Sequence, residues 1–278
     1  MLDILQFLAA PFAMSMVLVG ILGYFGLHVL RREVLFVDLA LAQIAAMGVV
    51  IAFLFGHQPG TAASFVFSLG AATLGAAIFS WTRVPGGRVP QEAIIGITYV
   101  VASAATIVVA DRAPEGAEHL MDLLAGSILW VGWPRVLRDL AVCALVGGFH
   151  FVMRRRFIRL SEDVEGVRAE GLNVRWWDFL FYLSFGLVIT LAVEVAGVLM
   201  VFAYLVAPAI IAVTSSDHWG TRLVLSWAVG VAASVLGLFA SYQWDLPSGP
   251  AIVSSLGVLL LLFAVWRRLT RDRRVDPA

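Results

Sequence analysis

The sequence contains no lysine, a single cysteine and few charged residues of either sign. All 19 basic residues are arginine, and charged residues make up only 14% of the 278 positions. Because Cys143 is the single cysteine, an intramolecular disulfide and a CxxC metal or redox site are excluded. The chain has no GxxxxGKS/T phosphate loop and no HExxH zinc motif, so it carries neither of these sites. It also has no basic face with interleaved aromatic residues, which argues against a nucleic-acid partner.

What the sequence has in excess is apolar length. Hydrophobic residues make up 61% of the chain, and the mean hydropathy is +0.92. Average soluble domains are about half apolar and about 25% charged. We therefore predict an all-α, polytopic membrane protein in which residues 1–278 form one transmembrane domain surrounded by lipid. The first 30 residues lack a basic leader and a small-residue cleavage site, so we expect a retained span there.

Apolar runs of about 20 residues, the length that crosses a ~30 Å hydrocarbon core, recur along the chain. We predict nine spans, at residues 7–30, 35–55, 61–82, 92–110, 136–153, 177–194, 197–214, 223–242 and 249–266. Residues 120–133 form a shorter apolar stretch, and a crossing there would place the cluster Arg154–Arg159 outside. This stretch is predicted to be a partial or re-entrant helix that lines protein or water, in a bundle of eight or nine spans.

The arginines divide the connecting loops into two sets. One side of the predicted bundle holds the basic loops, at 31–32, 83–88, 154–175, 222 and 267–274. The opposite loops, at 57–60, 111–119 and 243–249, contain only Arg112. Because basic loops mark the cytoplasmic side, we predict that the N-terminus lies outside and the C-terminus lies in the cytoplasm.

The apolar run at 177–214 is too long for one span. We predict two spans joined by a tight outward turn at Glu194. Gly197 and Pro208 are placed for close helix packing and for a break in the helix.

The longest basic loop, residues 154–176, contains the charged stretch SEDVEGVRAEG. Its pattern predicts a short helix with Ser161 as N-cap, acidic residues in the first turn and Gly171 as the stop signal. A stiff charged helix in a chain with few loops is either a docking element for a partner or a solvated connector. The sequence physics alone favours neither.

Four stretches, in order along the chain, together carry a family resemblance. They are EAIIGITY (92–99), LLAGSILWV (123–131), AGVLMVFAYLVAPAIIA (196–212) and DLPSGPAIV (245–253). With these stretches the chain resembles the permease subunits of ATP-binding-cassette importers for zinc, manganese and iron, and in overall order the permeases for cobalamin and siderophores. The matching signature and packing positions are Gly126, Gly197, Pro208, Asp245, Pro247 and Gly249.

The resemblance implies a type II importer-like permease in the bacterial cytoplasmic (inner) membrane, working as a dimer, with homodimers expected. An extracytoplasmic solute-binding protein would dock outside, and an ATP-binding-cassette subunit would bind and hydrolyse ATP inside. The chain itself would be no enzyme and would hold no cofactor. The family's coupling segment maps onto Asp163, Glu165, Val167, Ala169, Gly171 and Leu172. Val167 replaces the family's alanine, and we expect it still to occupy a groove in the partner.

One segment, FVDLALAQIAAMG (36–48), departs from the family pattern Gly-Asp-Ala-x-Ser-His-x-x-x-x-Gly. Aligned on Gly48, Gln43 replaces the histidine, and Asp38 is displaced by one residue, or about 100° around a helix. For Asp38 and Glu92 two interpretations remain open: each carboxylate is simply stabilised at a helix end, or it belongs to the translocation pathway. Gln43 either bonds between helices or eases the passage of a hydrated ion.

These features predict a permease for divalent transition metals, zinc or manganese first and iron next, that works by alternating access. We expect no tight metal site, since a closed site would trap the ion. A permease for a metal chelate remains an alternative, and a gradient-driven secondary transporter is a further one. The latter would be expected to keep paired buried carboxylates or broken helices near the midplane.

Overall fold

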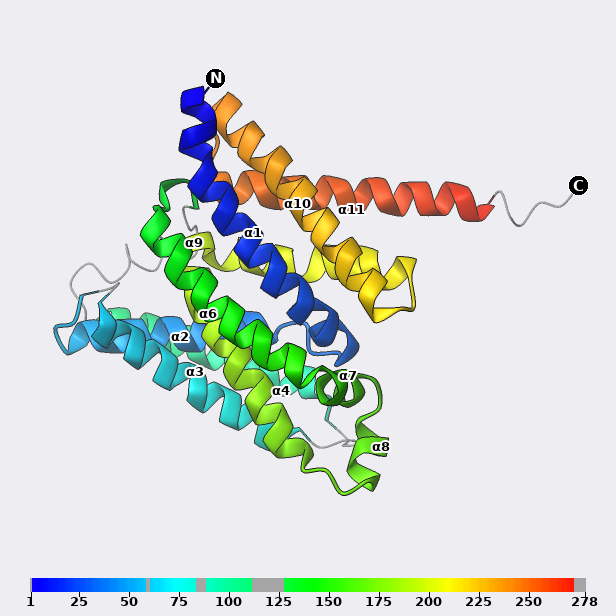
Figure 1. Cartoon of the computed structure of the whole chain (residues 1–278). Helices are drawn as coiled ribbons and strands as arrows, with labels where there is room; N and C mark the ends of the chain where they lie inside the picture. Colours follow the sequence, from blue (N-terminus) through cyan, green and yellow to red (C-terminus); the bar gives the residue numbers. More distant parts are fainter. Residues whose placement is uncertain (1, 59–60, 84–88, 112–127, 273–278) are drawn as a thin grey trace, which may run out of the picture.

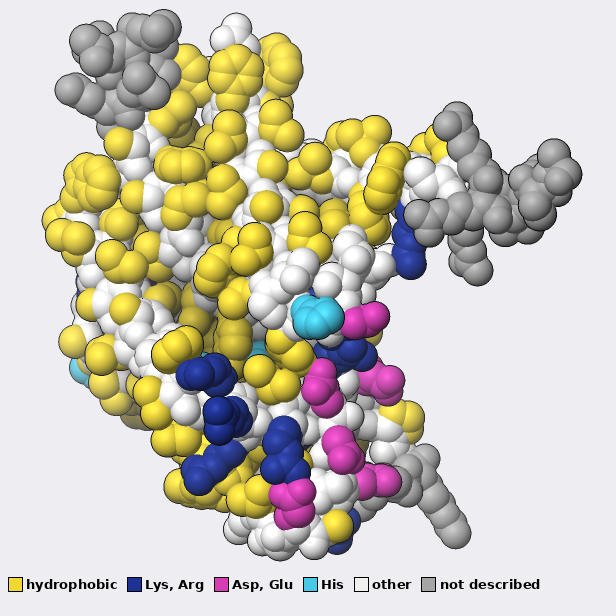
Figure 2. All heavy atoms as spheres, turned by 45° about the vertical axis from the view of Figure 1, so that its right-hand side comes forward, with side chains coloured by type: hydrophobic (Ala, Val, Ile, Leu, Met, Phe, Trp, Pro, Cys, Tyr) yellow, Lys and Arg dark blue, Asp and Glu magenta, His cyan; other side chains and the backbone are white. Residues whose placement is uncertain are grey.

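The computed structural model describes residues 2–58, 61–83, 89–111 and 128–272, which form a bundle of helices without strands in these ranges (Figure 1). In chain order they are α1 (Leu2–Arg31), α2 (Val37–Leu54), α3 (Ala62–Thr82), α4 (Gln91–Ala110), the 3-10 turn η1 (Ile128–Trp130), α6 (Trp133–Val152), α7 (Arg154–Glu162), α8 (Val164–Ala169), α9 (Val174–Ser215), α10 (Trp219–Trp244) and α11 (Ser248–Asp272). The predicted all-α class is confirmed. Apolar side chains cover most of one face, and charged ones gather at its lower end (Figure 2).

The helices are long enough for a polytopic protein. Seven of them, α1, α2, α3, α4, α9, α10 and α11, are long and apolar enough to cross a membrane. An eighth span arises if α6 and α7, which meet at a bend of 74°, are taken together. At 1.5 Å per residue the 42 residues of α9 extend about 63 Å, twice the hydrocarbon thickness. Counting α9 as two crossings brings the total into the range predicted.

A break inside α9 supplies the predicted division of this long run. Gly197 has φ 73° and ψ 159°, a backbone conformation that favours glycine, and the helix changes direction there (Figure 1). The turn had been predicted at Glu194, but Glu194 stays helical and its Oε2 lies 2.7 Å from Nη2 of Arg135 on α6. This ion pair ties the end of the first half of α9 to α6.

The basic connection between α6 and α9 differs from its prediction in one respect. Ser161 does not cap a helix, because it lies in the last turn of α7 and is buried. Asp163 is the cap of α8 instead, and its Oδ1 accepts a hydrogen bond from the Gly166 N–H at 2.8 Å. Gly171, at φ +81°, lies two residues past the end of α8, as its predicted role as a stop signal requires.

The predicted partial helix at 120–133 lies largely outside the described residues. Its end is η1, whose Ile128 is buried and whose Trp130 is exposed. The signature residue Gly126 also lies outside them.

The core is arranged around α9, which packs against α1, α2, α3, α6, α10 and α11. Buried aromatic side chains, among them Phe25, Phe181, Tyr182 and Phe185, fill the space between α1 and α9. The closest approach is at Gly26 of α1, where a Cβ atom would lie 2.0 Å from the carbonyl oxygen of Leu205. Only a glycine lets these two backbones meet.

We expect Gly26→Ala to destabilise the bundle by about 1–3 kcal/mol or more, because the added methyl overlaps backbone that cannot move away by a rotamer change. Gly20→Ala on the same helix is the matched control, since a Cβ there has no atom within 4 Å. Thermal unfolding in detergent should show a lower midpoint for Gly26→Ala alone. Equal midpoints would contradict the packing.

Candidate functional site

Two carboxyl groups lie where α2 and α4 begin. Asp38, in the first turn of α2, is 1% exposed, and its Oδ1 has no hydrogen-bond partner. Glu92, in the first turn of α4, accepts a hydrogen bond on Oε1 from the Phe36 N–H at 3.0 Å, while its Oε2 is buried without a partner. The two helix starts are thus joined, and each presents one unsatisfied acidic oxygen.

This arrangement suits a passing cation. The two carboxyl groups lie at helix starts that are joined to each other, because Glu92 accepts from the N–H of Phe36, two residues before Asp38, and two negative charges at such a buried site would repel each other. A divalent cation would relieve it, because carboxylate oxygens are ligands for hard metal ions such as manganese. Over the described residues, no group of three or more His, Cys, Asp or Glu side chains could hold a metal. The two carboxylates therefore offer an incomplete coordination set of the kind that releases an ion.

Gln43 lies on a different face of α2 from Asp38. Leu39, Gln43 and Met47, four residues apart, form a half-buried stripe on a helix that is otherwise mostly buried. Among the described residues, none forms a hydrogen bond with the Gln43 side-chain amide. At its displaced position the Asp38 side chain is buried in the protein interior, whereas the Gln43 side chain is half-buried.

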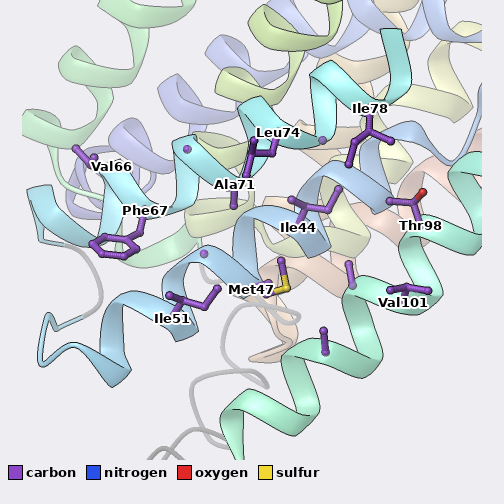
Figure 3. A pocket seen from close by; sticks show the side chains of 15 residues that line it. Ile44, Met47, Ile51, Val66, Phe67, Ala71, Leu74, Ile78, Thr98 and Val101 are labelled. Carbon is purple, nitrogen blue, oxygen red and sulfur yellow. The ribbon is translucent and has the colours of Figure 1, made fainter. Parts of the chain in front are cut away.

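An apolar groove of about 730 Å³ beside this stripe is unsuited to ions (Figure 3). Its walls come from α2, α3 and α4, with Met47, Ile51, Leu74 and Val101 among the side chains that line it. The Thr98 hydroxyl is its only polar side chain, and it is engaged in donating to the Ile94 carbonyl at 2.7 Å. An ion would lose its hydration there without gaining ligands, so the groove is not part of the candidate pathway.

A buried ion-pair network joins the start of α9 to the turn before α2 and to the end of α3. Asp178, near the start of α9, accepts from Nη1 of Arg32 at 2.7 Å and from Nη1 of Arg83 at 2.7 and 2.8 Å. The side chains of Arg32 and Asp178 are both 0% exposed. Burial lowers the pKa of Arg32 and Asp178 opposes that shift, but arginine remains protonated in proteins. The network thus holds two positive charges on one carboxylate.

Hydrogen bonds extend this network to α7 and to α4. Nε of Arg32 donates to Oγ of Ser161 at 2.9 Å, which ties the α1–α2 turn to α7. Nε2 of Gln91, the residue before Glu92, donates to the Tyr182 hydroxyl of α9 at 3.2 Å. A continuous set of contacts therefore runs from α7 to the starts of α2 and α4. Sequence reasoning missed it, although an acidic residue at the basic end of an apolar run was a usable signal.

The predicted coupling segment forms the loop around α8. Asp163, Glu165 and Ala169 are exposed, and Leu172 is half-buried next to the Gly171 turn. Val167, expected to fill a groove in a partner, is only 2% exposed and packs within its own chain. That expectation is wrong, because the inward face of α8 is the one that carries Val167.

The signature residues that the structure describes lie in α9 and around the junction between α10 and α11. Gly197 is the kink of α9, and Pro208 is buried in its second half. Asp245 is exposed and left-handed at φ +50°, where α10 ends. Pro247 is exposed before α11, and Gly249 is buried in its first turn. Gly197 and Asp245 have positive φ angles, and within the described chain none of the signature residues forms a hydrogen bond or ion pair with Asp38 or Glu92.

A family model described as the ABC 3 transport family matches residues 3–268, almost the whole chain. The chain belongs to the ABC 3 transport family. The resemblance read from the four sequence stretches is thereby confirmed, and so is the assignment to a transporter membrane subunit.

Curated relatives of this ABC 3 chain include three that are described by the metal they transport. The manganese transport system membrane protein MntC of Listeria monocytogenes is 28% identical over 85% of this chain and 82% of the relative. The manganese import system permease protein ScaB of Streptococcus gordonii is 26% identical, over 92% and 90%. The chelated iron transport system membrane protein YfeD of Yersinia pestis is 25% identical, over 86% and 78%.

A solved structure of similar fold is PsaBC from Streptococcus pneumoniae in complex with Fab. The TM-score is 0.77 with 24% sequence identity, and the match covers 94% of this chain and 93% of the other. The agreement shows that the ABC 3 chain shares the fold of that solved chain across nearly its full length.

Proposed function

We propose that this chain is the permease subunit of an ATP-driven importer of divalent transition-metal ions, with manganese and zinc as first candidates and iron next. The unsatisfied carboxylate oxygens of Asp38 and Glu92 carry the proposal, because they offer a transient ligand pair without a closed site. The relatives described as manganese import proteins support the substrate class.

Asp38 and Glu92 would form an inner gate, and Gln43 would line the path beyond it. Alternating access requires that this gate follow ATP binding on another subunit. The contacts from α7 through Ser161, Arg32 and Asp178 give the movement a route to both helix starts. The chain itself performs no catalysis, and ATP hydrolysis takes place on the partner.

The partners follow from the surfaces that the chain leaves open. α4 and the C-terminal half of α11 expose apolar residues such as Ile97, Val101, Leu262 and Trp266, which a second permease copy would cover. The basic end, with α7 and α8, would face the cytoplasm and an ATP-binding-cassette subunit. The opposite end would receive an extracytoplasmic binding protein, with the N-terminus outside and the C-terminus inside.

A metal chelate is a second candidate substrate, favoured by the relative described as a chelated iron transport protein. Uptake by the reconstituted complex of permease, ATP-binding subunit and binding protein separates the two. Proteoliposomes that accumulate free manganese or zinc on ATP addition support the ion. Accumulation of iron only with a chelator supports the chelate, and ATP-independent uptake would overturn both.

Charge reversal on α8 tests the coupling segment. Because Glu165 is exposed on the segment proposed to dock, Glu165→Arg should lower substrate-stimulated ATP hydrolysis by about tenfold, equivalent to ~1.4 kcal/mol of binding. Glu33→Arg, an exposed reversal in the α1–α2 turn, is the matched control. Wild-type hydrolysis and copurification in Glu165→Arg would refute docking through α8.

A further inference from the structure

A second groove, of about 410 Å³, lies between α1, α6 and α10. Three helices each contribute a glycine to its wall, namely Gly20, Gly147 and Gly220. A Cβ at Gly20 or Gly220 would meet nothing within 4 Å, and one at Gly147 would meet only Ile21 Cδ1 at 3.8 Å. The glycines therefore keep space open that the protein does not use for its own packing.

One end of this groove is strongly basic. Arg154 lines it at the corner between α6 and α7, and Arg155 and Arg156 follow directly. In the described part of the chain no carboxylate pairs with these three arginines; Arg154 donates to the Phe151 carbonyl at 3.0 Å and stacks on its ring. Basic side chains gather below the hollowed apolar face in Figure 2. An anion placed there meets the Arg154 guanidinium, which has no carboxylate partner in the described chain, although the Glu162 carboxylate lies against Trp219 of the same lining.

Two tryptophans of α10 set the direction of the groove. Trp219 lies near the basic end, with its Nε1 donating to Glu162 of α7 at 2.6 Å. Trp227 lies two turns further on, about 12 Å along the helix, and its Nε1 donates to the Gly20 carbonyl at 3.0 Å. Both indole N–H groups are thus satisfied within the chain, and the Trp219 ring packs on the His28 ring at 4.8 Å between centroids, so both indoles are held in place as part of the groove wall. The groove therefore has a charged end and an apolar remainder, which matches the charged head group and the apolar chain of a lipid.

We propose that this groove binds an anionic phospholipid of the phosphatidylglycerol type. The phosphate would lie against Arg154, and one acyl chain would follow Gly147 and Gly20 toward Trp227. Basic pockets between transmembrane helices on the cytoplasmic side recognise anionic head groups in this way. A zwitterionic lipid satisfies the apolar walls but carries no net negative charge to balance the unpaired Arg154 guanidinium and the basic residues that follow it.

The site would adjoin the coupling segment. Arg154 is the first residue of α7, at the 74° corner with α6, and the Trp219–Glu162 hydrogen bond joins the groove to the last turn of α7. A bound phosphate would neutralise repulsion among Arg154, Arg155 and Arg156 and hold the corner. Lipid binding is independent of whether the cargo is a metal ion, so it can be tested without transport.

The test is lipid binding by the purified full-length permease, measured by native mass spectrometry after exchange into phosphatidylglycerol or phosphatidylcholine. We expect wild type to retain phosphatidylglycerol at least tenfold better. Arg154→Gln should remove that preference but leave general lipid binding. Gly147→Leu should block the chain path and lower retention of this lipid without a loss of thermal stability, because a Cβ there meets no close atom and the groove beside it, about 410 Å³, has room for the rest of the side chain. Arg267→Gln, an exposed arginine on α11, is the matched control.

Three results would overturn the proposal. Equal retention of the two lipids by wild type would remove the role of charge. An unchanged preference in Arg154→Gln would place the anion elsewhere. Displacement of phosphatidylglycerol by inorganic phosphate, together with wild-type behaviour of Gly147→Leu, would indicate a phosphate site without an acyl-chain groove.

Discussion

Asp178→Asn is expected to lower the stability of the fold by about 3–5 kcal/mol, the cost of breaking a buried ion pair by removing one partner. The substitution preserves shape but leaves the guanidiniums of Arg32 and Arg83 without a counter-charge. Nη2 of Arg32 already lacks a partner, so the interior has no spare acceptor to offer. The same change cuts the contacts between α9 and the turns that precede α2 and α4.

Thermal unfolding of the purified variant measures this loss. Asp217→Asn is the matched control, because Asp217 also pairs with an arginine, Arg222, but is 99% exposed and should contribute at most about 1 kcal/mol. Adding Arg83→Gln to Asp178→Asn should recover part of the loss, since it removes one uncompensated charge. A midpoint equal to that of Asp217→Asn would show that the network does not support the fold.

Coupling is a second readout of the same network. If Asp178 links α7 to the gate, the surviving Asp178→Asn protein should still stimulate ATP hydrolysis but transport fewer ions for each ATP consumed. A purely structural role would lower hydrolysis and transport together, in proportion to the folded fraction. The ratio of the transport rate to the hydrolysis rate therefore distinguishes a coupling role of Asp178 from a purely structural one.

The parts of the fold that depend on local sequence could be predicted. Apolar runs of about 20 residues have one low-energy solution in a membrane, so the helices lie where they were expected. The break at Gly197 was also readable, because a glycine in a 38-residue apolar run is where the backbone can turn. The Glu194 error arose because an acidic residue was assumed to face water, whereas Arg135 neutralises it.

The network and the fine structure of the coupling loop could not be predicted in this way. Arg32 and Arg83 are 146 and 95 residues from Asp178 along the chain, and no local pattern specifies which loops meet. Ser161 was a plausible cap by type, but its hydroxyl is claimed by His28 and Arg32, and α7 continues through it. A six-residue α8 is too short for its periodicity to show that Val167 faces inward.

Asp38→Asn is expected to change stability and transport in opposite directions. The carboxylate has a buried oxygen without a partner, so replacing the charge with an amide should leave stability unchanged or raise it by about 1 kcal/mol. The substitution also removes one of the two negative charges at the joined starts of α2 and α4, which favours the folded arrangement. Metal uptake should nevertheless fall at least tenfold, because the ion loses one of two ligands.

Initial uptake rates over a range of metal concentrations, together with the unfolding midpoint, test this expectation. Glu92→Gln should behave alike, since its amide oxygen can still accept from the Phe36 N–H. Gln43→Leu tests the other face of α2. It should change the rate of metal uptake without raising the unfolding midpoint, because Gln43 carries no buried charge that the substitution could remove. If Asp38→Asn lowers stability and uptake in parallel, Asp38 supports the helix start instead of the ion. Unchanged uptake would show that the translocation pathway does not pass along α2.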